Sequence, residues 1–170
     1  MAKLIANALL FNLGWLLCVA APQGIALAFA AAYLALHFTW VSDDRRELGF
    51  VMLVAVIGLS SDALGIELGL FQLSSSGFPW WLLALWLLFA TTLNHCLAWL
   101  KGSLWLSAAL GAFAGTSSYY AATRLGAADV SEPLWLTLMF WAVLWGFLLP
   151  LFVALSRGLR IGEVAREVSI

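Results

Sequence analysis

The chain has 170 residues, of which 64% are hydrophobic and 10% charged, with a formal net charge of −1 and a mean hydropathy of +1.00. A soluble domain is about 45–50% apolar and about 25% charged, so this composition argues against a soluble protein and predicts a polytopic membrane protein. The net charge near zero gives no basic surface, so nucleic acid is not expected as a partner.

Six apolar segments, separated by short stretches rich in glycine, proline and polar residues, are long enough to cross a bilayer, which takes roughly 17–25 residues. We therefore expect an all-α polytopic bundle of six transmembrane helices with short loops, forming a single domain over residues 1–170. The expected spans lie near residues 4–20, 24–41, 48–68, 80–100, 103–124 and 134–155.

The basic residues are distributed unevenly between the two sides of the expected bundle. All of them except Arg124 fall on the side of the N-terminus. They are Lys3, Arg45, Arg46, Lys101, Arg157, Arg160 and Arg166. Because cytoplasmic loops are enriched in Lys and Arg, both termini are predicted to be cytoplasmic.

Asp62 lies well inside the third expected span and is the first candidate for a functional residue. A charged side chain at the bilayer centre costs about 2.5–3.5 kcal/mol on insertion scales, so it needs a partner or a role. With a rise of about 1.5 Å per residue, Asp62 comes to the height of Ser117, Ser118 and Tyr119 in the fifth span. We predict that Asp62 faces the interior near these hydroxyls, and that Glu67 lies at the non-cytoplasmic interface. Alternatively, Asp62 only ties the two spans together.

A second polar layer is expected nearer the cytoplasm. It contains Asn94 and His95, with Thr91 on the same helix face as His95, and with His37 and Asn7 at a similar depth. These residues could form a ligand site or simply hydrogen-bond neighbouring helices. The two histidines could also be a bis-imidazole pair of haem ligands.

Two glycine pairs spaced four residues apart indicate close helix contacts. Gly111 and Gly115 lie in the fifth span, and Gly65 and Gly69 lie late in the third.

Several motifs support a resemblance to a known family. They are Asp62, Pro79-Trp80-Trp81-Leu82 with Leu85-Trp86, Phe89-Ala90-Thr91-Thr92-Leu93-Asn94-His95, and Gly111 to Gly126 with Ser118-Tyr119. In these motifs the chain resembles an uncharacterised (domain-of-unknown-function) family of small polytopic proteobacterial inner-membrane proteins. It departs from the family pattern at Thr116-Ser117, where a proline is expected. The resemblance implies a multi-pass protein of the bacterial inner (plasma) membrane. It also hints at lipid metabolism, because family members are often encoded near lipid-modifying enzymes. It names no catalytic residue.

The sequence leaves three kinds of function open. The first is a non-catalytic module that binds membrane lipids or assists a lipid-modifying enzyme, with self-association as a further option; the short loops, which leave little room for a soluble active site, favour it. The second is a membrane-embedded enzyme acting on a lipid-like substrate, and the third is a small proton-coupled transporter using Asp62 and Glu67. The candidate ligand-binding residues are Asp62, Ser117, Ser118, Tyr119, Asn94, His95 and Thr91. No cofactor or metal is expected, because the chain lacks a P-loop, a dinucleotide fingerprint, HExxH and CxxC.

Overall fold

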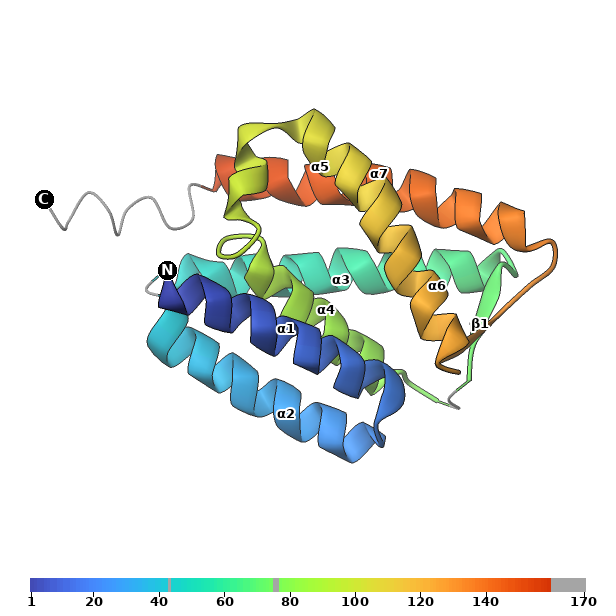
Figure 1. Cartoon of the computed structure of the whole chain (residues 1–170), viewed down its shortest axis with the longest axis horizontal. Helices are drawn as coiled ribbons and strands as arrows, with labels where there is room; N and C mark the ends of the chain where they lie inside the picture. Colours follow the sequence, from blue (N-terminus) through green and yellow to red (C-terminus); the bar gives the residue numbers. More distant parts are fainter. Residues whose placement is uncertain (43, 75–76, 160–170) are drawn as a thin grey trace, which may run out of the picture.

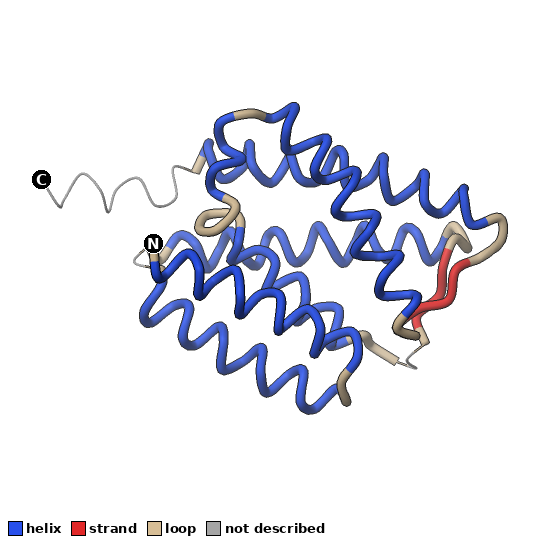
Figure 2. Tube along the Cα trace, in the orientation of Figure 1, coloured by secondary structure: helices blue, strands red, loops and turns tan. Residues whose placement is uncertain are grey.

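The structure is a computed structural model that describes residues 1–42, 44–74 and 77–159. The basic residues Arg160 and Arg166 therefore lie outside the described part. Helices dominate the fold, and two short strands pair at one end (Figures 1 and 2). The helices are α1 Ala2–Ala20, α2 Gln23–Leu36, the π-helix η1 His37–Val41, α3 Arg46–Glu67, α4 Trp80–Thr92, the 3₁₀-helix η2 Ala98–Gly102, α5 Leu104–Leu110, the π-helix η3 Gly111–Gly115, α6 Thr116–Arg124 and α7 Leu134–Gly158. The strands are β1 Phe71–Leu73 and β2 Ala128–Val130.

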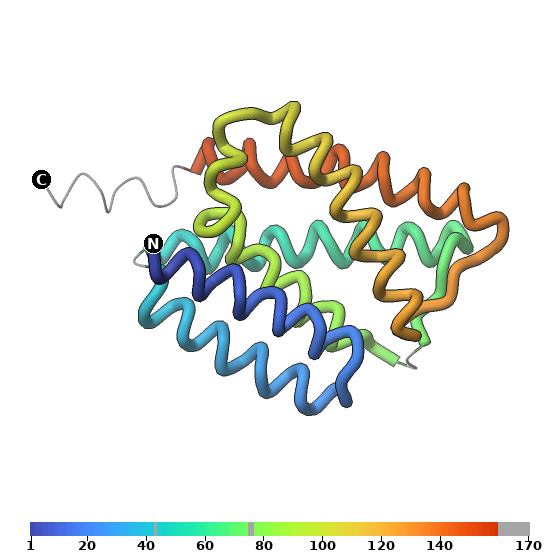
Figure 3. Tube along the Cα trace, viewed as in Figure 1, coloured from blue at the N-terminus to red at the C-terminus, as the bar shows by residue number. Residues whose placement is uncertain are grey.

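The chain passes along the bundle six times, and successive passes run in opposite directions (Figure 3). The second pass joins α2 to η1, and the fifth joins α5, η3 and α6 without a break. We call one end of the bundle the basic end, because it holds Lys3, Arg45, Arg46, Lys101 and Arg157. The opposite end is called the strand end, because β1 and β2 lie there (Figure 2). This arrangement confirms the expected all-α bundle of six helices.

Four helical segments are long and apolar enough to cross a membrane, judged by length and composition: α1, α2 with η1, α3 and α7. The helix α4 is equally apolar but has only 13 residues. The protein is therefore a membrane protein.

The short helix α4 lies in the middle of the bundle and packs against α1, α2 and α3. A helix covered on several sides needs apolar residues all round, and α4 has them. The expected span at 80–100 is helical only as far as Thr92, and the chain then turns through residues 93–97 into η2. At this point the hydroxyls of Thr91 and Thr92 donate to the carbonyls of Leu88 and Phe89, a local side-chain bond that competes with helix continuation.

Glycines allow α7 to approach the fifth pass closely. A Cβ atom built on Gly111 would lie 2.2 Å from the backbone oxygen of Trp145, and one on Gly115 would lie 2.2 Å from the Trp145 ring. This pair therefore makes the close contact that the sequence predicts. The second pair does not act as a helix motif, because Gly69 follows the end of α3 with a φ of +69°.

α3 and α6 end with the same backbone motif, and each leads into a strand. Gly69 and Gly126 both have positive φ, and each donates its N–H to the carbonyl three residues earlier. The N–H of the next residue bonds five residues back, which completes a Schellman motif at both sites. The strands then pair antiparallel, with Phe71 opposite Val130 and Leu73 opposite Ala128.

Candidate functional site

Asp62 points into the bundle and both of its carboxylate oxygens are hydrogen-bonded. The side chain is 2% exposed. The hydroxyl of Tyr119 donates to Oδ1 at 2.5 Å, and Trp86 Nε1 donates to Oδ2 at 2.7 Å. The carboxylate thus connects α3 to α4 and α6, and the prediction that it faces a hydroxyl of the fifth span is confirmed for Tyr119.

The position of Trp86 depends on a glycine one turn before Asp62. A Cβ atom on Gly58 would lie 2.2 Å from the Trp86 ring, so only glycine leaves the indole enough room. On its other side the Trp86 ring stacks on Trp145, with ring centroids 5.2 Å apart. These contacts hold the indole N–H against Asp62.

The neighbouring hydroxyls form hydrogen bonds with groups other than Asp62. The Ser118 hydroxyl accepts a hydrogen bond from Trp15 Nε1 at 2.8 Å. Ser117 is exposed and donates to the carbonyl of Phe113 on its own helix. Glu67 is exposed at the end of α3, as expected for a group at an interface.

Asp62 lies between an open groove and a small cavity. The groove, about 670 Å³ in volume, lies among the end of α3, β1 and the start of α4, and its polar lining includes Ser60, Asp62 and Gln72. The cavity, about 30 Å³, lies towards Trp15, Tyr119 and Trp141. Asp62 lines both.

Thr91 belongs to a different polar network, which joins α1, α2 and α4. Asn7 Nδ2 donates to the hydroxyl of Tyr33 at 2.7 Å, and that hydroxyl lies 2.8 Å from Thr91 Oγ1. All three side chains are buried. Because each polar atom here is paired within the protein, Thr91 fits a structural role better than a ligand contact.

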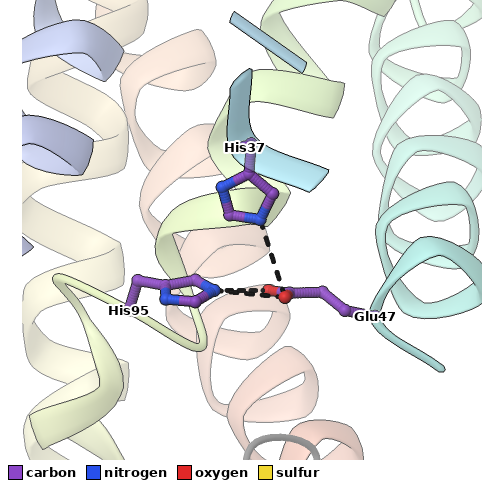
Figure 4. A group of neighbouring side chains, drawn as sticks. All are labelled: His37, Glu47 and His95. Atoms are coloured by element: carbon purple, nitrogen blue, oxygen red, sulfur yellow. Dashed lines mark hydrogen bonds and ion pairs between the residues drawn. The ribbon is translucent and has the colours of Figure 1, made fainter. Parts of the chain in front are cut away.

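The most compact polar cluster lies near the basic end and brings together His37, Glu47 and His95 (Figure 4). His95 Nε2 lies 2.9 Å and 3.1 Å from the two oxygens of Glu47, and His37 Nε2 lies 3.6 Å from Oε2. Each residue offers one atom that could bind a metal, and the three atoms lie within 4.8 Å of one another. Glu47 and His37 are each 1% exposed.

Asn94, which precedes His95 in the turn after α4, helps to position the carboxylate of this cluster. Its Nδ2 donates to Glu47 Oε1 at 3.4 Å, and its Oδ1 accepts a hydrogen bond from the Ser156 hydroxyl of α7. Asn94 and His95 therefore bond the same carboxylate, a common partner that was not predicted from the sequence.

The haem interpretation of His37 and His95 is wrong. Their rings meet edge to face, with centroids 4.8 Å apart and an interplanar angle of 89°. Both Nε2 atoms face the same carboxylate, so no porphyrin plane fits between them.

Glu47 is the residue that the sequence interpretation missed. It stands beside Arg46 at the start of an expected span, where a charge usually meets water. However, the buried positions of α3 include Glu47, Val51, Val54, Gly58 and Asp62, which recur every three or four residues. Extending this helical periodicity backwards from Asp62 would have placed Glu47 on the buried face.

Comparison with known proteins identifies the family of the chain. No curated protein and no solved structure matches it. The family model described as "Protein of unknown function (DUF2878)" matches residues 4–151, which is most of the chain. The chain therefore belongs to this family of unknown function.

Proposed function

We propose that the protein binds an amphiphilic molecule, a membrane lipid or a lipid-like compound, in the groove beside Asp62. The observation that supports this most directly is a buried carboxylate lining an apolar groove that opens at the surface of the bundle. Ligand sites are typically apolar clefts of about 300–1,000 Å³ with a few polar groups, and the groove of about 670 Å³ has this form.

The chemistry of Asp62 indicates which amphiphiles fit. An ionised carboxylate only accepts hydrogen bonds, and it has about four lone-pair sites. Tyr119 and Trp86 use two of them. The others can accept from a hydroxyl or amine of a headgroup, while the acyl part lies against Leu59, Ile66 and Leu82. A bacterial inner-membrane lipid, presented directly or by a lipid-modifying partner enzyme, is the ligand that this proposal favours.

The test uses protein purified in detergent, exposed to a polar lipid extract and analysed by native mass spectrometry. Ala63 is exposed and lines the groove, so Ala63→Trp should fill it without touching the bonds of Asp62. Ala32→Trp, at an exposed position of α2, is the matched control. We expect wild type and Ala32→Trp to retain one lipid class that Ala63→Trp and Asp62→Asn lose. Equal lipid retention in all four proteins would refute the proposal.

A membrane-embedded enzyme is the second candidate, and the cluster at the basic end favours it. Paired His95 and Glu47 could act as an acid–base pair on a lipid-like substrate. The purified protein should then convert a component of the lipid extract, as detected by mass spectrometry, and His95→Ala should abolish the conversion. An unchanged extract would eliminate this candidate without affecting the groove.

A further inference from the structure

The fold brings both histidines of the chain to one carboxylate. His37 lies on η1, Glu47 in the first turn of α3, and His95 in the turn after α4. The chain has two histidines in total, so no other imidazole competes for the role. The three residues come from three separate segments and converge in space (Figure 4).

We propose that His37, Glu47 and His95 bind a divalent transition-metal ion of the Zn²⁺ type. Two imidazoles and one carboxylate form a ligand set that Zn²⁺ uses in sites that keep one coordination position open. Bonds of about 2.0–2.2 Å to a tetrahedral ion place neighbouring ligand atoms about 3.4 Å apart. The observed separations from Glu47 oxygens, 2.9 Å and 3.1 Å to His95 and 3.6 Å to His37, bracket that value.

The state of His37 supports a ligand rather than a plain ion pair. The ring is fully buried, and within the described residues neither of its nitrogens has a hydrogen-bond partner. Its Nε2 nevertheless faces Glu47 Oε2 at 3.6 Å, too far for a hydrogen bond but suited to an ion between them. A buried polar atom without a partner is unfavourable, and coordination would satisfy Nε2.

The backbone around His37 gives a second, independent indication. The helix that begins with α2 changes to a π-helix at His37–Val41. Such segments are rare and often lie at functional sites, because the wider turn reorients a side chain. Here the π-helix begins at the histidine that faces Glu47.

The surroundings also resemble the outer layer of a metal site. Metal-binding carboxylates are usually held in turn by further hydrogen bonds. Asn94 donates to Glu47 Oε1, and Ser156 on α7 bonds Asn94. His95 is partly exposed, with 16% of its side chain accessible, which offers the ion a way in from the basic end.

This inference does not depend on the proposed lipid groove, and it gives His95 and Glu47 a different role from the acid–base pair of the second candidate. Glu47 precedes Asp62 by fifteen positions on α3, which corresponds to about 22 Å along the helix. Blocking the groove should therefore leave metal binding intact, and losing the metal should leave lipid retention intact.

The test is isothermal titration of Zn²⁺ into the full-length protein, purified in detergent with a tag that contains no histidine. We expect one Zn²⁺ per chain for wild type. Because removal of outer hydrogen bonds alone weakens metal affinity by about 10–100-fold, removal of a ligand in His37→Ala or His95→Ala should weaken it by more than about 100-fold. Asn94→Ala should fall between wild type and these variants.

Two control variants separate this site from other zinc ligands. Glu67→Gln removes an exposed carboxylate at the strand end, and Cys96→Ser removes the thiol next to His95. Both should bind Zn²⁺ like wild type. If His37→Ala misfolds, as size-exclusion chromatography would reveal, the partly exposed His95→Gln provides the same comparison. Fewer than about half an equivalent of Zn²⁺ bound to wild type, or unchanged affinity in the histidine variants, would reduce the cluster to an ion pair and overturn the proposal.

Discussion

The indole rings of Trp86 and Trp145 stack with an interplanar angle of 7°, and each ring covers a glycine on its outer face. Gly58 of α3 faces Trp86, and Gly115 faces Trp145. The segments α3, α4, η3 and α7 thus pack together through two stacked indole rings that lie between two glycines. The stack also fixes the indole N–H that bonds Asp62, so packing and the candidate site depend on the same side chains.

Gly58→Ala should destabilise the protein. The added methyl would meet the Trp86 ring at 2.2 Å, and that ring is held by Trp145 and Asp62. Overpacking of this kind costs about 1–3 kcal/mol. Gly49→Ala on the same helix, where a Cβ atom would meet nothing within 4 Å, is the matched control. Thermal unfolding in detergent should show a lower Tm for Gly58→Ala only, and equal Tm values would contradict the tight stack.

Tyr119→Phe should also destabilise the protein, because it leaves one oxygen of a buried carboxylate without its donor. Loss of such a bond costs about 1–3 kcal/mol. Tyr120→Phe, which removes the hydroxyl of the exposed neighbouring tyrosine, should have almost no effect. In an Asp62→Asn background the cost of Tyr119→Phe should shrink, and a double-mutant cycle by thermal unfolding would measure the difference. A cycle with purely additive effects would argue against the bond.

Replacement of Asp62 distinguishes hydrogen bonding from charge. Asp62→Asn keeps a polar group of the same size, so we expect a folded protein that has lost lipid retention. Asp62→Leu removes both acceptors and leaves Trp86 and Tyr119 without a partner, so we expect loss of folding as well. Size-exclusion chromatography and native mass spectrometry report the two properties separately. Full lipid retention in folded Asp62→Asn would show that the charge has no role.

The two asparagines of α1 should respond very differently to alanine. Asn7 is 1% exposed and bonds Tyr33, whereas Asn12 is exposed and bonds the carbonyl of Ala8 on its own helix. Asn7→Ala should lower stability by about 1–3 kcal/mol, because it leaves buried partners unpaired. Asn12→Ala should change stability by less than about 0.5 kcal/mol. Thermal unfolding of the two variants measured side by side tests this contrast. If Asn7→Ala is as stable as wild type, the hydrogen-bond network around Asn7 does not stabilise the fold.

The predicted orientation can be tested with reporter fusions. The basic end should be cytoplasmic because it holds nearly all Lys and Arg. Fusions at Asp44 and Gly102 should report cytoplasm, and fusions at Gly24, Gly77 and Ala127 should report the opposite side. A cytoplasmic signal from Gly77 would reverse or break the predicted topology.

The sequence predicts the helices well, because helix formation depends on residues that lie close together in the chain. Apolar runs of bilayer length must satisfy their backbone groups internally, and Pro22, Gly69 and Gly126 mark three of the helix ends. The similar depth of Asp62 and Tyr119 in the bundle can also be predicted, because an α-helix rises by a constant distance per residue.

Other features depend on contacts between distant segments and could not be predicted from the sequence. Strands of three residues give too short a pattern to recognise, and their pairing joins two separate loops. The early end of α4 lies within a continuous apolar stretch. In the sequence, Glu47 looks like an ordinary flanking charge, because its partners His95 and His37 come from distant segments of the chain.

The pairing of β1 with β2 imposes an order on assembly in the membrane. Phe71 and Val130 cannot meet until α4, α5 and α6 have all been inserted between them. Neighbouring helices can pair as soon as both are present, but the strand pair cannot form until residues 128–130 have been synthesised. This small sheet therefore forms only after the fifth pass has been made, late in the biogenesis of the protein.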